Sequence, residues 1–131
     1  MDILTINPGS TTTKIAVFQD MVPLFTETIT HDADELKKMK GIFGQLHFRE
    51  SLIKQVVAKN DYNIKKLSAV VARGGMIIGL HGGGYKVTPA LCKAMKDPKN
   101  PPHASSMGAQ LAFDIAEPLG IPSFIYDSTM G

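Results

Sequence analysis

The chain has 131 residues, of which 44% are hydrophobic and 20% charged, and its formal net charge at pH 7 is +2. This length suits one domain with a hydrophobic core, no apolar run is long enough to span a bilayer, and Asp2 stands where a signal peptide would be positive. We therefore expect a cytoplasmic protein, and the scattered lysines argue against a nucleic-acid-binding one.

The first predicted element is a β-hairpin. Ile3–Asn7 and Lys14–Phe18 are rich in β-forming residues and flank a Pro-Gly turn that is followed by four consecutive hydroxyl residues, Ser10–Thr13. Two interpretations of the turn stay open. It is ordinary hairpin chemistry, or it gathers N–H groups, hydroxyls and the ammonium of Lys14 around an anion such as phosphate. Neither a P-loop nor a dinucleotide-binding glycine motif is present.

A third strand is predicted at Leu24–Thr30, linked to the hairpin by residues 21–23, and completes an antiparallel meander. Asp32 to Lys40 begins with acidic residues and ends with lysines, as a short helix does. From Leu46 to Asn60, apolar residues recur at helical spacing. The charged residues of this helix, Arg49 among them, are expected mostly on other parts of its surface.

Leu67–Ala72 predicts a short buried strand, reached from the preceding helix by a parallel crossover onto the first sheet. It ends at Arg73, and a glycine-rich loop follows at residues 79–84. This loop has two open interpretations, a flexible hairpin tip or a place where the backbone approaches a ligand or another domain closely.

The last elements are two helices and a strand. Thr88 and Pro89 are typical of a helix start, and this helix is expected to run to about Lys96. A second helix is expected from Met107 to Ile115, before Pro118. A strand at residues 123–126 then ends at Asp127. The chain stops four residues later without a covering element, which leads us to expect a longer protein.

Three meander strands followed by helix-linked parallel strands predict an α/β fold of the ribonuclease-H-like class, the fold of the actin-like ATPase domains. In its mixed sheet, Asn7, Arg73 and Asp127 each follow a strand and are expected to converge at one edge. The lone Cys92 indicates a small buried or near-surface residue. The four histidines are too far apart to indicate a zinc site.

Four motifs resemble one family. The segment Ile6–Lys14 is similar to the first phosphate motif of the acetate and butyrate kinases, a branch of the superfamily of acetate kinase, sugar kinases, Hsp70 and actin. Residues 70–75, 83–87 and 103–109 resemble the butyrate kinase versions of three further motifs, in the same order. The combination covers most of the chain.

The resemblance implies phosphoryl transfer between ATP and a short-chain fatty acid, with Mg²⁺ bridging the nucleotide phosphates. It implies a phosphate site at Asn7, Gly9, Ser10, Thr12 and Lys14, with Asn7 also linked to the metal. Three catalytic roles are implied. Arg73 would hold the carboxylate or the phosphoryl group, His103 would donate near the transition-state oxygens, and Asp127 would position the substrate or metal.

The chain departs from the family at several positions. Val70 stands where acetate kinases have an arginine and Arg73 where they have a histidine, so the role of Arg73 is assigned by function and not by strict alignment. His81 and Ser106 replace residues that butyrate kinases usually have as Pro and Asn.

The family also implies a domain organisation. Residues 1–131 would be the first domain of a two-domain acid kinase, and the second, nucleotide-side domain would be its partner. Alone, this domain is expected to be inactive, and a homodimer of the full-length enzyme stays open. The alternatives are a stand-alone, non-catalytic binding or assembly domain of the same fold, or a fragment of a regulatory ATPase from the superfamily.

Overall fold

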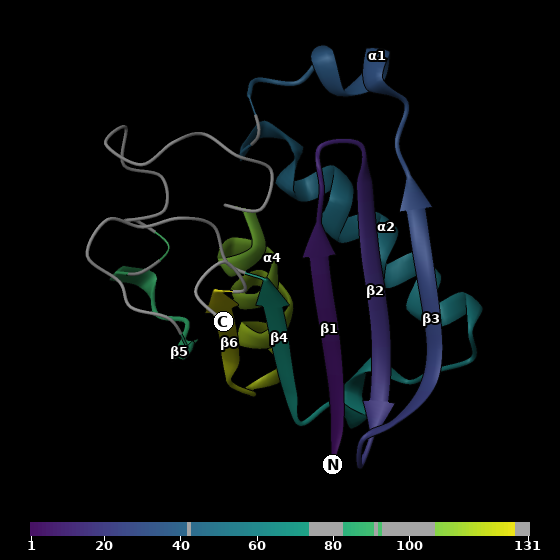
Figure 1. The fold of residues 1–131 in the computed structure, drawn as a ribbon, viewed down its shortest axis with the longest axis vertical. Helices are drawn as coiled ribbons and strands as arrows, with labels where there is room; N and C mark the ends of the chain where they lie inside the picture. The colour runs from purple at the N-terminus through teal and green to yellow at the C-terminus, as the bar shows by residue number, and fades with distance from the viewer. Residues whose placement is uncertain (42, 74–82, 91, 93–106, 128–131) are drawn as a thin grey trace.

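The computed structural model describes residues 1–41, 43–73, 83–90, 92 and 107–127. Its strands form one mixed six-stranded sheet in the order β3-β2-β1-β4-β6-β5 (Figure 1). The strands are β1 (Asp2–Pro8), β2 (Thr12–Gln19), β3 (Val22–Thr30), β4 (Ala69–Arg73), β5 (Gly83–Lys86) and β6 (Ser123–Asp127). The helices are α1 (Ala33–Lys37), α2 (Leu46–Lys59) and α4 (Gly108–Ala116), with 3-10 turns at Phe43–Gln45, Ile64–Lys66 and Glu117–Leu119. None of the described helices is long and apolar enough to cross a membrane.

The meander and the parallel strands have the predicted arrangement. β1 pairs antiparallel with β2, and β2 with β3. β4 joins β1 in parallel, with Ile6 opposite Ala72, and β6 joins β4 in parallel. The predicted ribonuclease-H-like α/β fold is therefore confirmed, and β1, β4 and β6 all end at the same edge of the sheet (Figure 1).

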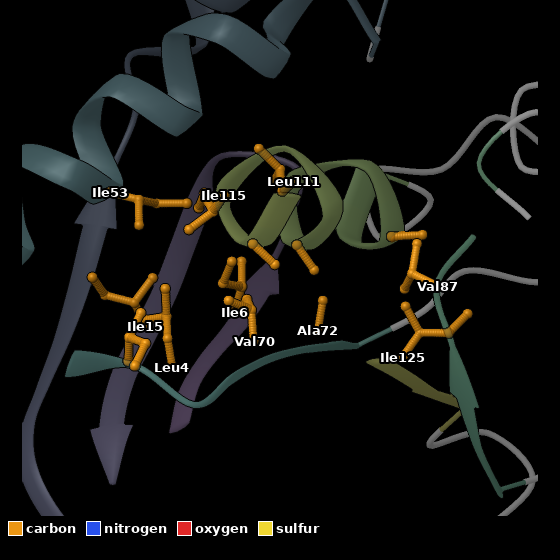
Figure 2. Close-up of a cluster of buried hydrophobic side chains, with 14 of the residues drawn as sticks. Leu4, Ile6, Ile15, Ile53, Val70, Ala72, Val87, Leu111, Ile115 and Ile125 are labelled. Carbon is orange, nitrogen blue, oxygen red and sulfur yellow. The ribbon is translucent and has the colours of Figure 1, made fainter. Parts of the chain in front are cut away.

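The core lies between one face of this sheet and the two longer helices. Figure 2 shows Leu4 and Ile6 of β1 and Val70 of β4 pointing toward Ile53 of α2 and Ile115 of α4, and all five are nearly inaccessible to solvent. Because side chains alternate along a strand, the residues between them lie on the opposite face. In the described part of the chain, α2 and α4 both lie on the core side (Figure 1).

Three sequence expectations need correction. The third strand begins at Val22 and so includes Pro23, which an edge strand such as β3 tolerates because its outer N–H groups are unpaired. The strand β5 was not predicted, since its first two residues are glycines, which are rare in strands. Arg49 is fully buried, although a charged residue of an amphipathic helix was expected at the surface.

Two expectations fall wholly or partly outside the described residues. The helix expected after Thr88 is helical at residues 89, 90 and 92, and its predicted continuation to Lys96 lies outside them. Of the glycine-rich loop, only Gly83 and Gly84 are described, as the start of β5. Cys92 is buried, as expected for a small apolar residue.

Candidate anion site at the sheet edge

Three polar side chains form a row across the carboxyl-terminal edge of the sheet. Lys14 of β2 lies directly opposite Asn7 of β1 in the strand register. Arg73 follows Ala72, which pairs with Ile6 in parallel, so Arg73 continues the same row on β4. The Cβ atoms of directly paired residues on adjacent strands are about 5 Å apart. The structure therefore brings two cationic groups and one amide together.

This row lies on the sheet face opposite the helices. Ile6 and Ala72 are buried on the core side, and Asn7 and Arg73 are the next residues along their strands, so they alternate to the other face. Thr12 is two residues before Lys14 and shares its face. Asn7, Thr12 and Arg73 are partly exposed and Lys14 is exposed, which leaves the row accessible to a ligand.

The turn between β1 and β2 is tight, and the missing side chain at Gly9 leaves room for the Thr12 hydroxyl. The Gly9 N–H donates to Thr12 O at 2.7 Å. A Cβ added at Gly9 would stand 2.9 Å from Thr12 Oγ1, closer than side-chain carbons come to such atoms. Within the described residues, the backbone N–H groups of Ser10 and Thr11 have no hydrogen-bond acceptor. The turn thus carries two free donors beside the row.

Behind the turn, Arg49 of α2 bonds to its backbone carbonyls. Its Nη1 donates to Gly9 O at 2.7 Å and to Thr12 O at 2.9 Å, and its Nη2 donates to Ser10 O at 3.2 Å. Gln45 Oε1 accepts from Nε and Nη2 at 3.1 and 2.8 Å. Burial lowers the pKa of Arg49, and no described carboxylate forms an ion pair with it.

A second buried polar contact adjoins Arg49. Thr13 Oγ1 lies 2.8 Å from His31 Nε2, and Nη1 of Arg49 donates to the same hydroxyl at 3.2 Å. The backbone N–H of His31 donates to Thr11 O at 2.8 Å. Burial, and next the positive charge of Arg49, lower the pKa of His31, and its buried Nδ1 has no hydrogen-bond partner in the described part of the chain. Both effects favour the neutral imidazole beneath the turn.

An open hollow of about 460 Å³ adjoins the same turn on the side of α1. Ser10, Thr11, Lys37 and Gln45 contribute its polar lining, and Leu36 and Met39 are among its apolar residues. The hollow leaves space for solvent or a ligand next to Ser10 and Thr11.

The described residues at this edge suit a phosphate better than a bare metal ion. Mg²⁺ prefers anionic and neutral oxygen ligands in octahedral geometry. Here Asn7 offers one neutral oxygen between two cationic side chains, and the described residues contain no group of three or more His, Cys, Asp or Glu side chains that could hold a metal ion. The metal role of Asn7 remains a prediction.

Of the predicted catalytic residues, only Arg73 is described with its side chain. His103 lies outside the described residues. Asp127 is the last residue of β6, at the same edge as Asn7 and Arg73, and pairs with Gly83 of β5. The predicted convergence of these three strand ends is confirmed, whereas the roles of the residues stay predictions.

Arg49, Gln45 and His31 were not predicted to support the turn. One signal was available in the sequence: Thr13 is in phase with Ile15 and Val17 along β2, and therefore lies on the buried face. A buried hydroxyl requires a hydrogen-bond partner. That requirement points to polar residues on the elements covering this face.

Comparison with known proteins gives a consistent relationship. No protein-family model matches the chain. It is 45% identical over 126 residues to a probable butyrate kinase of Listeria monocytogenes serovar 1/2a, covering 96% of this chain and 36% of that protein. A probable butyrate kinase of serotype 4a is 44% identical over the same coverage. The chain spans about a third of these relatives, matching their N-terminal part.

Solved structures share the fold at low sequence identity. The acetate kinase of Porphyromonas gingivalis has a TM-score of 0.66 and 14% identity, over 98% of this chain and 37% of that one. A propionate kinase of Francisella tularensis has a TM-score of 0.62 and 14% identity, with the same coverage. RuvC of Thermus thermophilus, solved with a Holliday junction substrate, has a TM-score of 0.54 and 12% identity, over 98% of this chain and 66% of that one. Because kinases and RuvC share this fold, the fold alone does not identify a function.

Proposed function

This chain is a homologue of the N-terminal third of the butyrate kinases, and on that premise we propose that it is the acid- and phosphate-binding part of a short-chain acid kinase. The reaction is phosphoryl transfer between ATP and a short-chain fatty acid, giving an acyl phosphate and ADP. The observation that carries the proposal is the row formed by Lys14, Asn7 and Arg73, beside a turn with two free N–H groups.

The reaction requires little covalent chemistry from the protein. A carboxylate oxygen of the acid attacks the γ-phosphorus of ATP, the bond from that phosphorus to the β,γ-bridging oxygen breaks, and ADP leaves with the electron pair. The acid is already ionised near neutral pH, so its attack requires no general base. Catalysis then consists of holding two anions in line and stabilising the negative charge on the transferring group.

The residues at the sheet edge have different roles in this reaction. Lys14, the hydroxyls of Ser10 and Thr12, and the N–H groups at the turn bind phosphate oxygens, and the Asn7 amide orients them. Arg73 lies at the far end of the row, where its planar guanidinium can take two oxygens of a carboxylate or phosphoryl group. Arg73 would thereby offset the repulsion between the two reacting anions.

The remaining roles rest on the family resemblance of the sequence motifs alone. We assign to His103 a hydrogen bond to the transferring oxygens and to Asp127 the positioning of substrate or metal. ATP and Mg²⁺ are expected because the relatives are kinases, and Mg²⁺ when bound would neutralise nucleotide phosphate charge. A second domain would supply the nucleotide contacts, and without it the chain is expected to be inactive.

The test is acyl hydroxamate formation from ATP and butyrate, measured on this chain and on the product of a reading frame extended past Gly131. We expect turnover only from the extended protein, and a loss of at least about a hundredfold in Arg73→Ala, because a charge-assisted interaction in the transition state is worth several kcal/mol. Lys65→Ala, at an exposed lysine outside the site, is the control. Unchanged turnover in Arg73→Ala would remove Arg73 from the site.

A further inference from the structure

The carbonyl groups of the β1–β2 turn converge on one buried guanidinium. Gly9 O, Ser10 O and Thr12 O all accept from Arg49, which reaches them from α2, nearly forty residues further along the chain. A closed two-residue turn would instead bond Gly9 O to the N–H of Thr12, and that bond is absent between these two described residues. Arg49 thus replaces the usual bond that closes the turn.

The geometry of the peptide unit also sets the direction of the N–H groups in this turn. In a trans peptide unit the C=O of one residue and the N–H of the next point in opposite directions, and no cis peptide bond occurs in the described chain. Because Gly9 O and Ser10 O point toward Arg49, the N–H groups of Ser10 and Thr11 point away from it. Neither of these two donors has an acceptor among the described residues.

The positive charge of Arg49 also favours an anion at these N–H groups. A guanidinium that is fully buried and bonded only to neutral oxygens keeps its positive charge uncompensated by any described carboxylate. In a low-dielectric interior such a charge is felt strongly at short range. An anion on the far side of the turn therefore meets two N–H dipoles aligned with a positive charge behind them.

We propose that Arg49 is a positioning residue of the anion site, holding the Gly9–Thr12 turn so that the N–H groups of Ser10 and Thr11 receive a phosphate, and attracting that phosphate by its buried charge. The proposal rests on the proposed function for the identity of the anion. Gln45 shares the task, since its Oε1 accepts two hydrogen bonds from Arg49 and fixes the plane of the guanidinium.

The test compares three variants of this chain. Arg49→Met removes both the charge and the hydrogen bonds, and Arg49→Lys keeps the charge but loses the planar set of donors. Lys54→Met is the matched control, because Lys54 is on the same helix and only forms an exposed pair with Glu50 at 3.0 Å. Two measurements are made on each: amide hydrogen exchange of Gly9 and His31, whose N–H groups donate to the turn, and titration with inorganic phosphate followed by the NMR shifts of Ser10 and Thr11.

We expect exchange at Gly9 and His31 to become about tenfold faster in both Arg49 variants, relative to the amides of β4, because the turn loses its hydrogen bonds. Phosphate affinity should fall about tenfold in Arg49→Met and less in Arg49→Lys, which keeps the charge. Lys54→Met should match the wild type in both. If Arg49→Met does not fold, the test rests on Arg49→Lys, in which amide exchange at Gly9 and His31 must still be faster than in the wild type.

Unchanged exchange and phosphate affinity in a folded Arg49→Lys or Arg49→Met would overturn the inference. A different outcome would contradict the proposed function instead. If the wild-type chain gives no saturable shift with phosphate while the Arg49 variants lose amide protection, the turn is positioned by Arg49 but phosphate is not its ligand. The two claims therefore fail separately.

Discussion

Gly108, in the first turn of α4, packs against the backbone of Arg73 so closely that a Cβ on this glycine would stand 2.2 Å from the Arg73 carbonyl oxygen. The same added atom would lie 3.3 Å from the Cβ of Ala72. Helix α4 therefore rests directly on the end of β4, and the absence of a side chain at one helical position determines where Arg73 lies at the sheet edge.

The first prediction concerns this contact. Gly108→Ala should lower the free energy of unfolding by about 1–3 kcal/mol, because the clash is with backbone and cannot be relieved by a rotamer change. It should also shift the NMR signals of Arg73 and its neighbours. Gly44→Ala is the control, since a Cβ there would meet Lys40 at an ordinary 3.4 Å. Equal stability of the two variants in urea denaturation would contradict the close packing.

A second prediction follows from buried His31. Its pKa is lowered in the folded state, by burial first and then by Arg49, so on acidification the unfolded chain takes up this proton before the folded chain does. Stability contributed by neutral His31 is present above about pH 6.5 and is lost as the pH falls below that value.

Urea denaturation at a series of pH values between about 7.5 and 5 would measure this loss. His31→Gln should flatten the stability profile in that range, because no imidazole is left to titrate beneath the turn. His47→Gln, at an exposed histidine of α2, is the matched control and should keep the wild-type slope. Identical slopes in the two variants would show that His31 does not carry the pH dependence.

The third prediction concerns the start of β1. The phenol of Tyr62 donates to the carboxylate of Asp2, which is only 8% exposed. Burial, the hydrogen bond and the negative charge of Asp2 raise the pKa of Tyr62. Tyr62→Phe should lower the free energy of unfolding by about 1–3 kcal/mol, since it leaves a buried carboxylate oxygen unpaired.

A double-mutant cycle with Asp2→Ala checks the Tyr62 prediction. The effect of Tyr62→Phe should largely disappear in the Asp2→Ala background. Equal effects in both backgrounds would show that the loss does not come from the hydrogen bond to Asp2, since the ring and its edge-on contact with Phe25 are kept in Tyr62→Phe.

The fourth prediction separates binding from stability at the turn. Gly9→Ala places a methyl group 2.9 Å from Thr12 Oγ1, so the Thr12 hydroxyl must rotate away from the position in which we expect it to bind phosphate. Phosphate affinity should fall about tenfold, the usual effect of losing one charge-assisted hydrogen bond. The melting temperature should change little. Wild-type phosphate affinity in the Gly9→Ala variant would exclude the Thr12 hydroxyl as a ligand.

All strands except β5, the two long helices and the parallel crossover were predictable, because these strands and helices follow a local periodicity and the crossover follows from their order. Alternation in residues 3–7 and 14–18 and the helical spacing of Leu52, Ile53 and Val56 identify their elements without reference to the rest of the chain. The family resemblance added the expected site residues, and the relationship to butyrate kinases is confirmed.

What the sequence did not reveal depends on distant contacts. Arg49 is charged, and a helical wheel assigns charged residues to solvent, whereas its partners at Gly9, Ser10 and Thr12 lie about forty residues away. Strand β5 likewise exists because Gly83–Lys86 pairs with the edge of β6, although its glycines have low strand propensity.

The central claim is that Lys14, Asn7 and Arg73 form one anion site with the turn of β1 and β2. NMR titration of this chain with inorganic phosphate tests it most directly, using the wild type, Lys14→Met, Arg73→Met and the surface control Lys65→Met. We expect saturable shifts at Ser10 and Thr11 in the wild type and in Lys65→Met, and an affinity about tenfold weaker in each of the two site variants. Shifts that do not saturate, or that are equal in all four proteins, would contradict the claim.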